Sequence, residues 1–361
     1  MTGLADYTTL GLGGPARSFV AASTESELIA AITAADAAAE PVLLIGGGSN
    51  LVIADDGFRG TVIHLNTRGV SHAQAGDGRA DVTVAAGEDW DDVVAATVAE
   101  GLAGLECLSG IPGRAGATPI QNVGAYGHEV AEVITTVRVF DRLSRQIQII
   151  PNERCRFSYR TSMFKSGEHG RYVVLAVTFR LAREPLSMPV KYAELAAELD
   201  VEMGARAGVG DLRSGVLKIR ARKGMLLNPG DPDSRSVGSF FTNPVLDPEQ
   251  FARVESAAAR AAGVRGAPGV PGAPGPVPRF DAGDGLVKVP AAWLIEHAGF
   301  GKGYGAPGRA RISSKHTLAL INAGGATTAD LLALAREIRD GVRAAFGVTL
   351  DPEPVLVGVT L

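Results

Sequence analysis

Cysteine is nearly absent from this chain of 361 residues, which contains only Cys107 and Cys155. The two residues lie far apart in the sequence, and neither has a second ligand residue at the spacing of a metal site. We therefore expect no metal centre. Two reduced thiols are what a cytosolic protein usually carries.

Long apolar runs and a strong charge of one sign are also missing. No apolar stretch approaches the roughly 20 residues of a membrane-spanning helix, and residues 1–7 lack the basic and apolar regions of a signal peptide. The net charge is −4 and the pI is about 5.9, which argues against a general nucleic-acid-binding protein. We expect a cytoplasmic protein with no membrane insertion and no nucleic-acid partner.

Apolar residues make up 46% of the chain, which is enough for two or three domains with real cores. Thr24 and Glu27 form a capping box at the start of a helix. Apolar patterns predict strands at 42–45, 61–65, 81–86, 137–141, 146–150 and 172–181. They predict further helices at about 89–100, 210–224, from 248, at 291–298 and at 329–346. Because helices and strands do not alternate regularly, the pattern favours an α+β fold over a doubly wound sheet.

A run of glycines, Gly46–Asn50, follows the apolar stretch 41–45 directly. Glycine allows a positive φ and a close approach of a ligand to the backbone, and exposed N–H groups in such a turn form a nest for phosphate oxygens. An ordinary tight turn is the alternative. Another glycine-rich stretch, at 11–16, has the G-x-G-x-x-A pattern of a dinucleotide-binding fingerprint. No strand precedes it and a strand pattern follows it, so we reject a dinucleotide-binding site there.

A second glycine-rich segment covers 108–127 and has almost no bulky side chain that would need a core. Such a segment suits backbone packing against a flat ligand, with hydrogen bonds from Thr118, Gln121 and Asn122. The alternative is an irregular structural loop. The segment 266–278, rich in glycine and proline, resembles collagen but is far too short for a triple helix, and we predict a surface loop.

Several segments together resemble one family, the UDP-N-acetylenolpyruvoylglucosamine reductases, in the longer class whose tyrosine loop closes over the substrate. They are GGGSNLVIADDGFRGTVI at 46–63, GLECLSGIPGRAGATPIQNVGAYG at 104–127, CRFSYRTSMFK at 155–165, GSFFTNP at 238–244, AAWLIEHAGFGKG at 291–303 and LDPEPVLVG at 350–358. The resemblance covers nearly the whole chain. It implies an α+β protein with a vanillyl-alcohol-oxidase/PCMH-type FAD-binding fold and a separate α+β substrate-binding domain.

The resemblance also implies three domains and two redox partners. The first FAD-binding subdomain is expected at 1–70 with 348–361, the second at 71–228, and the substrate-binding domain at 229–347. FAD is bound non-covalently and NADPH is the co-substrate. The implied FAD contacts are Gly46, Gly47, Gly48, Ser49 and Asn50 for the pyrophosphate, and Pro112, Gly113, Thr118, Asn122 and Gly124 along the flavin. Leu51, Ala117 and Gln121 are further implied cofactor contacts.

The family reaction, a step of peptidoglycan synthesis, sends hydride to C3 of an enolpyruvyl group on a UDP-sugar and a proton to C2. A negative charge develops at C2, so the site needs a fixed cation and a proton donor. The resemblance assigns enolate stabilisation to Arg160 and Glu353 and proton donation to Ser239. Asp351 competes with Glu353 but lies outside the Pro-Glu pair of the motif.

Substrate contacts implied by the resemblance are Tyr126, Tyr192, Arg220, Lys223 and Asn243. Arg220 and Lys223 are three residues apart on one helix face and can jointly meet a diphosphate; a solvated basic face is the alternative. His316 is a structural residue or a ligand. We expect a monomer.

Two other functions remain open at this point. A degenerate flavoprotein could bind FAD only as a scaffold, although Arg160, Ser239 and Glu353 are all present. An oxidase of the same fold superfamily often tethers FAD through His or Cys near the first glycine loop, whereas this loop has neither and His64 lies on the following strand.

Overall fold

The computed structural model describes residues 2–166, 170–265 and 276–361, and the chain divides into two compact units. The first unit comprises Met1–Gly3, Pro15–Ser49 and Phe58–Leu226. The second unit comprises Leu4–Gly14, Asn50–Gly57 and Leu227–Leu361. The three-domain division inferred from the sequence stays a prediction. Most of the glycine- and proline-rich segment, 266–275, lies outside the described residues.

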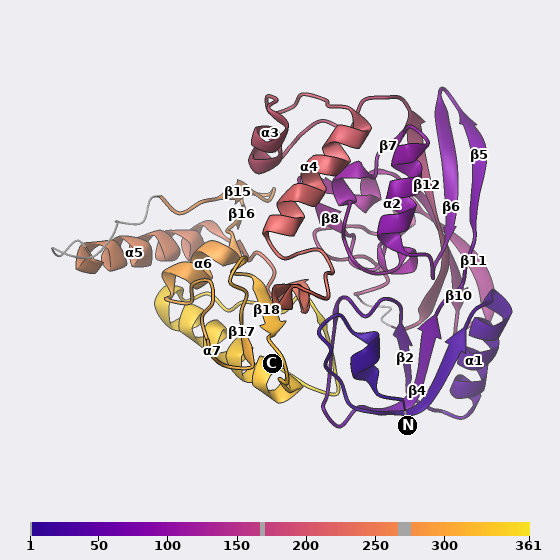
Figure 1. The fold of residues 1–361 in the computed structure, drawn as a ribbon, viewed down its shortest axis with the longest axis horizontal. Helices are drawn as coiled ribbons and strands as arrows, with labels where there is room; N and C mark the ends of the chain where they lie inside the picture. Colours follow the sequence, from indigo (N-terminus) through magenta and orange to yellow (C-terminus); the bar gives the residue numbers. More distant parts are fainter. Residues whose placement is uncertain (1, 167–169, 266–275) are drawn as a thin grey trace. The chain divides into compact units, whose positions relative to one another are not determined.

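A small parallel sheet opens the first unit (Figure 1). Its strands are β1 (Ala16–Ala22), β4 (Phe58–Leu65) and β2 (Val42–Ile45), in that order. Helix α1 (Glu25–Ala37) lies against β1 and β4 and begins with the predicted capping box of Thr24 and Glu27. Strand β1 follows the G-x-G-x-x-A segment at 11–16. A strand at this place was predicted, and it is the reason why this segment is not a dinucleotide-binding fingerprint.

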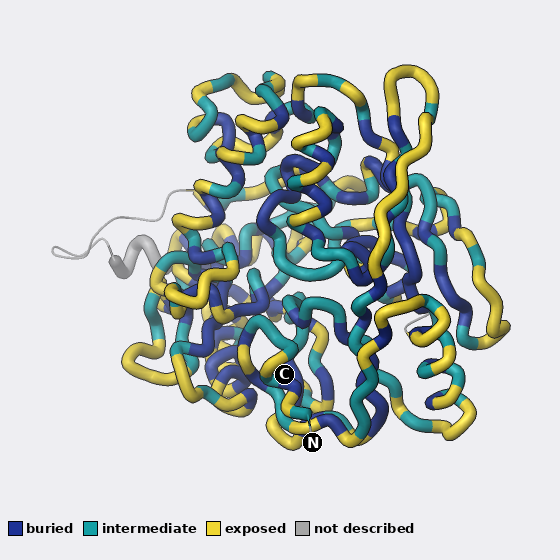
Figure 2. The backbone as a smooth tube through the Cα atoms, turned by 45° about the vertical axis from the view of Figure 1, so that its right-hand side comes forward, coloured by how far each residue is buried: buried dark blue, intermediate teal, exposed yellow. Residues whose placement is uncertain are grey.

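A larger antiparallel sheet forms the rest of the first unit's framework, with strand order β11-β10-β12-β6-β5 and β7 paired with β12. The strands are β5 (Val70–Gly76), β6 (Arg79–Ala85), β7 (Leu102–Ala103), β10 (Ile134–Asp141), β11 (Gln146–Pro151) and β12 (Tyr172–Arg183). Strand β5 is an edge strand and is exposed along most of its length (Figure 2). Helix α2 (Trp90–Ala99) packs on the sheet through Trp90, whose ring centroid lies 5.6 Å from that of Phe179.

Short elements and two helices complete the first unit. Helix α4 (Val209–Arg222) packs against α3 (Ala193–Leu199) around a small apolar cluster that contains Leu195, Leu212 and Ile219. Both cysteines are buried and form no disulfide, and burial raises the pKa of the Cys155 thiol to about 12. The short elements are η2 (Glu106–Leu108), η3 (Ala115–Ala117), β8 (Gly124–Ala125), β9 (His128–Glu129), η4 (Val130–Glu132) and η5 (Asn152–Arg154).

In the part of the chain that the structure describes, three sheets, three α-helices and two short 3₁₀ helices make up the second unit. The sheet orders are β13-β18-β17, β14-β16-β15 and β19-β3, the last pair being parallel. The strands are β3 (Leu51–Ile53), β13 (Ser236–Ser239), β14 (Val245–Leu246), β15 (Phe280–Asp281), β16 (Val287–Lys288), β17 (Ala310–Ile312), β18 (Ala319–Asn322) and β19 (Val355–Val357). The helices are η1 (Leu4–Tyr7), η6 (Pro232–Ser234), α5 (Pro248–Arg265), α6 (Ala291–His297) and α7 (Thr328–Phe346).

Helix α7 shows why these sequences fold as predicted. Thr327 and Asp330 form a capping box at its start, and Gly347 with φ of 70° ends it. Its predicted apolar face is buried: Leu331, Leu334, Ala335, Ile338 and Val342. Among the helices that the structure describes, none is long and apolar enough to span a membrane. Nor does any group of three or more His, Cys, Asp or Glu in these described ranges fit a metal ion.

Two glycines provide a matched test of this packing. A Cβ on Gly60 in β4 would lie 2.2 Å from the Pro41 carbonyl oxygen, whereas a Cβ on Gly210 in α4 would meet nothing within 4 Å. We expect Gly60→Ala to lower the free energy of unfolding by about 1–3 kcal/mol because β4 and residue 41 must separate. Gly210→Ala should raise it by about 0.5–1 kcal/mol because alanine restricts the unfolded chain. Urea unfolding followed by circular dichroism measures both, and equal stabilities would contradict the close approach at Gly60.

Candidate active site

The two glycine-rich segments pack backbone against backbone in the first unit. Gly46–Ser49 leaves β2 in a turn where Gly48 has φ of +58°. A Cβ on Gly47 would lie 2.9 Å from the Cα of Gly113, and the Ser49 hydroxyl donates to the Pro112 carbonyl oxygen at 2.9 Å. Glycine is required on both sides of this contact because side chains would force the segments apart. The resulting backbone cradle fits the phosphates of the FAD that the resemblance implies.

Arg114 adds a cation to this cradle that sequence reasoning did not single out. A Cβ on Gly46 would lie 3.0 Å from its Cγ, so its side chain runs directly beside the first glycine segment. Its charge contributes, after burial, to lowering the pKa of His64. One arginine in a glycine-rich stretch has no periodic signal, so the sequence alone gives no reason to single it out.

The second glycine segment is held largely by its own polar side chains. The hydroxyl of the buried Thr118 donates to the Ala115 carbonyl oxygen at 2.7 Å. The Asn122 amide donates to Glu129 at 2.6 Å and to the Ser158 carbonyl oxygen at 3.2 Å, and Asn122 has φ of +47°. These bonds shape the loop. The other predicted flavin contacts on this segment, half-buried or exposed, are Pro112, Ala117, Gln121 and Gly124.

Arg160 lies outside this second segment but donates a hydrogen bond to it. It occupies a tight turn in which Ser158 and Thr161 exchange backbone hydrogen bonds at 3.1 Å, and its φ is +55°, unusual for a residue with a side chain. Its Nη2 donates to the Gly124 carbonyl oxygen at 2.9 Å. A Cβ on Gly124 would lie 3.2 Å from its Nη1. The same Cβ would lie 2.8 Å from the His128 carbonyl oxygen, so the absence of a side chain at Gly124 leaves room for both β9 and the guanidinium group.

Four of the predicted substrate residues meet near α3 and α4. The rings of Tyr126 and Tyr192 pack edge to face with centroids 5.5 Å apart. Arg220 is buried and donates to the Gly110 and Met225 carbonyl oxygens and to Tyr126. Burial raises the pKa of Tyr126 to about 12, and the nearby Arg220 only partly offsets it, so this phenol stays protonated. Lys223 forms an ion pair with Glu194.

A strap, residues 187–191, leads to Tyr192 and is held by two buried polar groups that sequence reasoning missed. Glu106 is fully buried, and its carboxylate accepts the backbone N–H groups of Gly104 and Met188, each at 2.6 Å. The ring of the buried His128 bridges the Glu132 carboxylate at 2.9 Å and the Pro189 carbonyl oxygen at 2.7 Å. Their bonds to the strap reach backbone atoms 82 and 61 residues away, which no local sequence pattern indicates.

In the second unit, Ser239 and Glu353 lie on adjacent backbone segments. The Glu353 N–H donates to the Phe240 carbonyl oxygen at 2.9 Å, and Phe241 pairs with Pro352 in an antiparallel bridge. Asn50 joins them: its side-chain amide donates to the Glu353 carbonyl oxygen at 3.4 Å. Residues from the start and the end of the chain therefore meet beside β13.

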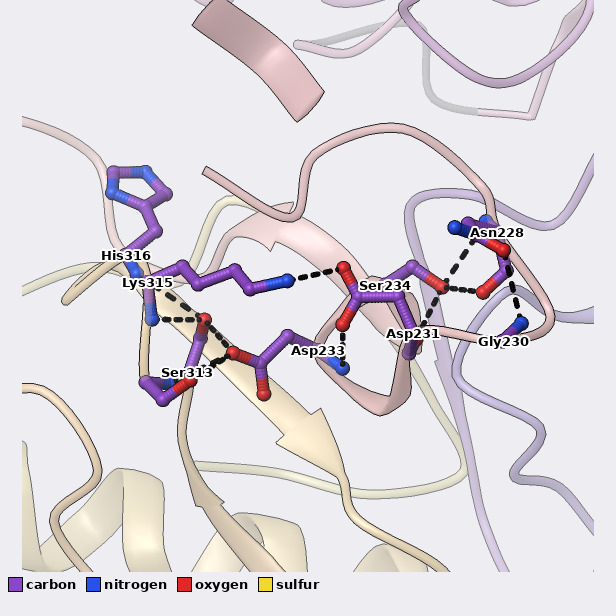
Figure 3. A network of polar contacts seen from close by, with 9 residues as sticks. Asn228, Gly230, Asp231, Asp233, Ser234, Ser313, Lys315 and His316 are labelled. Atoms are coloured by element: carbon purple, nitrogen blue, oxygen red, sulfur yellow. Dashed lines mark hydrogen bonds and ion pairs between the residues drawn. The ribbon is translucent and has the colours of Figure 1, made fainter. Parts of the chain in front are cut away.

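A buried carboxylate organises the approach to β13 (Figure 3). Asp233, 3% exposed, accepts hydrogen bonds from the hydroxyl of Ser313 at 3.1 Å and from the backbone N–H of Ser314 at 3.0 Å. Lys315 forms an ion pair with Asp231 at 2.6 Å. The same loop returns to Leu318, whose carbonyl oxygen accepts the N–H of Phe240 at 2.7 Å. The network thus fixes the strand that carries Ser239.

Asn243 and His316, by contrast, already have partners in the fold. The Asn243 side-chain oxygen accepts the N–H of Ala291 at 2.9 Å and so caps α6. The backbone N–H of His316 donates to the Ser313 hydroxyl at 3.2 Å. A role for Asn243 in substrate binding stays a prediction.

Comparison with known proteins identifies the two regions. Residues 16–149 match a family model described as an FAD binding domain. Residues 231–357 match a model described as UDP-N-acetylenolpyruvoylglucosamine reductase, C-terminal domain. The first match agrees with the FAD-binding fold and the cofactor expected from the sequence.

Curated relatives that match nearly the whole chain are named UDP-N-acetylenolpyruvoylglucosamine reductase. The UDP-N-acetylenolpyruvoylglucosamine reductase of Thermobifida fusca (strain YX) is 52% identical over 358 residues, covering 99% of this chain and 97% of that protein. The one from Streptomyces coelicolor is 56% identical, covering 99% and 90%. A crystal structure of the enzyme from Thermus caldophilus has the same fold, with a TM-score of 0.63 at 24% identity and coverage of 99% and 97%. The chain belongs to the UDP-N-acetylenolpyruvoylglucosamine reductase family, and it is an FAD-dependent oxidoreductase.

Proposed function

We propose that this protein reduces the enolpyruvyl group of UDP-N-acetylglucosamine enolpyruvate to UDP-N-acetylmuramate, with NADPH as the electron donor, in peptidoglycan precursor synthesis. We propose further that it acts as a cytoplasmic monomer. When bound, FAD would supply the hydride-transfer chemistry between NADPH and C3 of the substrate. The chain's own residues hold the cofactor, orient the substrate and manage the charge and the proton at C2.

The developing negative charge determines what Arg160 and Glu353 do in this proposal. A guanidinium group is planar and permanently charged, so Arg160 can stabilise an enolate and its carboxylate without losing a proton. Its tight turn and its bond to Gly124 support this role because they fix the side chain in advance. Glu353 is proposed to share the stabilisation of the enolate with Arg160.

Ser239 is the proposed proton donor. A serine is a weak acid, so a nearby charged group must assist it. The observation that carries the proposal is the backbone pairing of the segments around Phe240 and Glu353, since it places a hydroxyl and a carboxylate on neighbouring segments. No hydrogen bond engages the Ser239 hydroxyl within the described residues, which leaves that hydroxyl available to a substrate.

Binding of the UDP-sugar is proposed for Tyr126, Tyr192, Arg220, Lys223 and Asn243. Lys223 offers a mobile ammonium group to a phosphate, and its present partner Glu194 would be exchanged for the ligand. Arg220 is buried and already bonded to two carbonyl oxygens and Tyr126. It therefore serves mainly to hold Tyr126 and to supply positive charge.

An anaerobic two-step experiment tests the function. The purified protein should be yellow and should release FAD when denatured. NADPH should bleach the flavin, and the enolpyruvyl nucleotide should restore the colour without oxygen. A flavin that NADPH cannot bleach would indicate a scaffold, and one that only oxygen reoxidises would indicate an oxidase.

Replacing Ser239 separates the two half-reactions. We expect Ser239→Ala to keep flavin bleaching by NADPH while slowing reoxidation by the enolpyruvyl nucleotide roughly 10²–10⁴-fold, because the proton donor is lost. Stopped-flow absorbance measures both steps. Ser256→Ala, on helix α5, is the control and should match the wild type. Unchanged reoxidation of the Ser239 variant would remove this residue from the mechanism.

Lys218 lies in the C-terminal half of α4 and Lys223 directly follows its last residue, so replacements of the two lysines can be compared. We expect Lys223→Ala to raise KM for the UDP-sugar roughly ten- to one-hundredfold with little change in kcat, because a charged hydrogen bond to phosphate is lost. Lys218 is 68% exposed in its side chain, so Lys218→Ala should have no effect. Steady-state kinetics give both constants. A loss confined to kcat would contradict phosphate binding by Lys223.

A further inference from the structure

Arg114 has a rigid backbone in the middle of the second glycine segment. The Gly113 carbonyl oxygen accepts the N–H of Trp90 at 3.1 Å, and the Ala115 N–H donates to the Glu88 carbonyl oxygen at 2.9 Å. Arg114 itself pairs with Asp89 in an antiparallel bridge. Backbone hydrogen bonds of the residues on both sides therefore fix the position of the Arg114 Cα atom.

The side chain runs beside the first glycine segment and is only 19% exposed. Its Cβ and Cγ lie 3.2 and 3.0 Å from where a Cβ on Gly46 would stand. Its Nε is buried, and no acceptor among residues 2–166, 170–265 and 276–361 bonds to it. A buried donor left without an acceptor destabilises the fold, and more so when the group is charged.

Nearby side chains do not supply the missing acceptor. Asp89 approaches the Nη1 of Arg114 at 3.6 Å, but its carboxylate caps α2 by accepting the N–H of Asp91 at 3.2 Å, and it is 44% exposed. The pKa of His64 is lowered by burial and then by the charges of Arg114 and Arg68. Arg68 is paired with Glu88, and Asp89 lies 3.6 Å from the Nη1 of Arg114, so the Arg114 Nε remains a buried donor from which an anionic ligand can accept a hydrogen bond.

We infer that Arg114 binds the pyrophosphate of FAD, with its Nε donating to a phosphate oxygen. A guanidinium group matches phosphate geometry through parallel N–H donors. The adjoining turn at Gly46–Gly48 presents backbone N–H groups to the same kind of ligand. The inference rests on FAD binding, which the family carries, and is independent of the proposed substrate.

Rebinding of FAD to the deflavinated protein tests this assignment. We expect Arg114→Met to raise the Kd for FAD roughly ten- to one-hundredfold, measured by quenching of flavin fluorescence. The slope of log Kd against log salt should become smaller, because one cation no longer meets the phosphates. Arg114→Lys should recover part of the affinity. Arg79→Met, a replacement of an exposed arginine in β6, should match the wild type.

Thermal unfolding separates ligand binding from a purely structural role. Without FAD, Arg114→Met should be at least as stable as the wild type, because it removes an unsatisfied buried donor. The rise in Tm on adding FAD should be smaller for the variant. An apo variant of lower Tm with an unchanged Kd for FAD would overturn the inference and make Arg114 structural. Failure of the wild-type protein itself to bind FAD would contradict the cofactor assignment as a whole, and this outcome is distinguishable from a failure of the Arg114 inference.

Discussion

The site depends on one close approach of backbone to backbone. Gly47 and Gly113 come so near each other that even a methyl group would not fit between them. Two consequences follow from this approach. The N–H groups of the first segment are presented at a fixed place, and the second segment is held where Thr118, Asn122 and Arg160 can shape it. Side-chain interactions then refine a surface that the main chain has already formed.

The second unit brings together residues from distant parts of the chain. Asn50 comes from an early segment, Ser239 from β13 and Glu353 from the C-terminal segment, and backbone hydrogen bonds bring the three together. The buried Asp233 supports this arrangement by fixing the loop that contacts Phe240. Because one charged group accepts several hydrogen bonds there, the loop has a single well-defined path.

Much of this architecture could be predicted from local pattern. Helix α7 has a regular apolar face and two clear ends, and the glycine segments stand out by composition. The family resemblance then located candidate residues such as Arg160 and Ser239, whose roles remain predictions. Arg114, Glu106 and His128 were not foreseen because their importance comes from burial and from backbone partners that only the folded chain supplies. Nor does the Asn243 motif reveal that its side chain caps α6.

The hydrogen bonds of the strap before Tyr192 restrict how this part of the chain can move. Its N–H at Met188 is bonded to a buried carboxylate and its carbonyl oxygen at Pro189 to a buried imidazole, while Val190 exchanges backbone bonds with residues 204 and 205. A shift of the whole strap would break these bonds and leave the buried side chains of Glu106 and His128 without these hydrogen-bond partners, which is unfavourable. A change in the position of the Tyr192 ring therefore has to come from its own side-chain torsions and not from a shift of the strap.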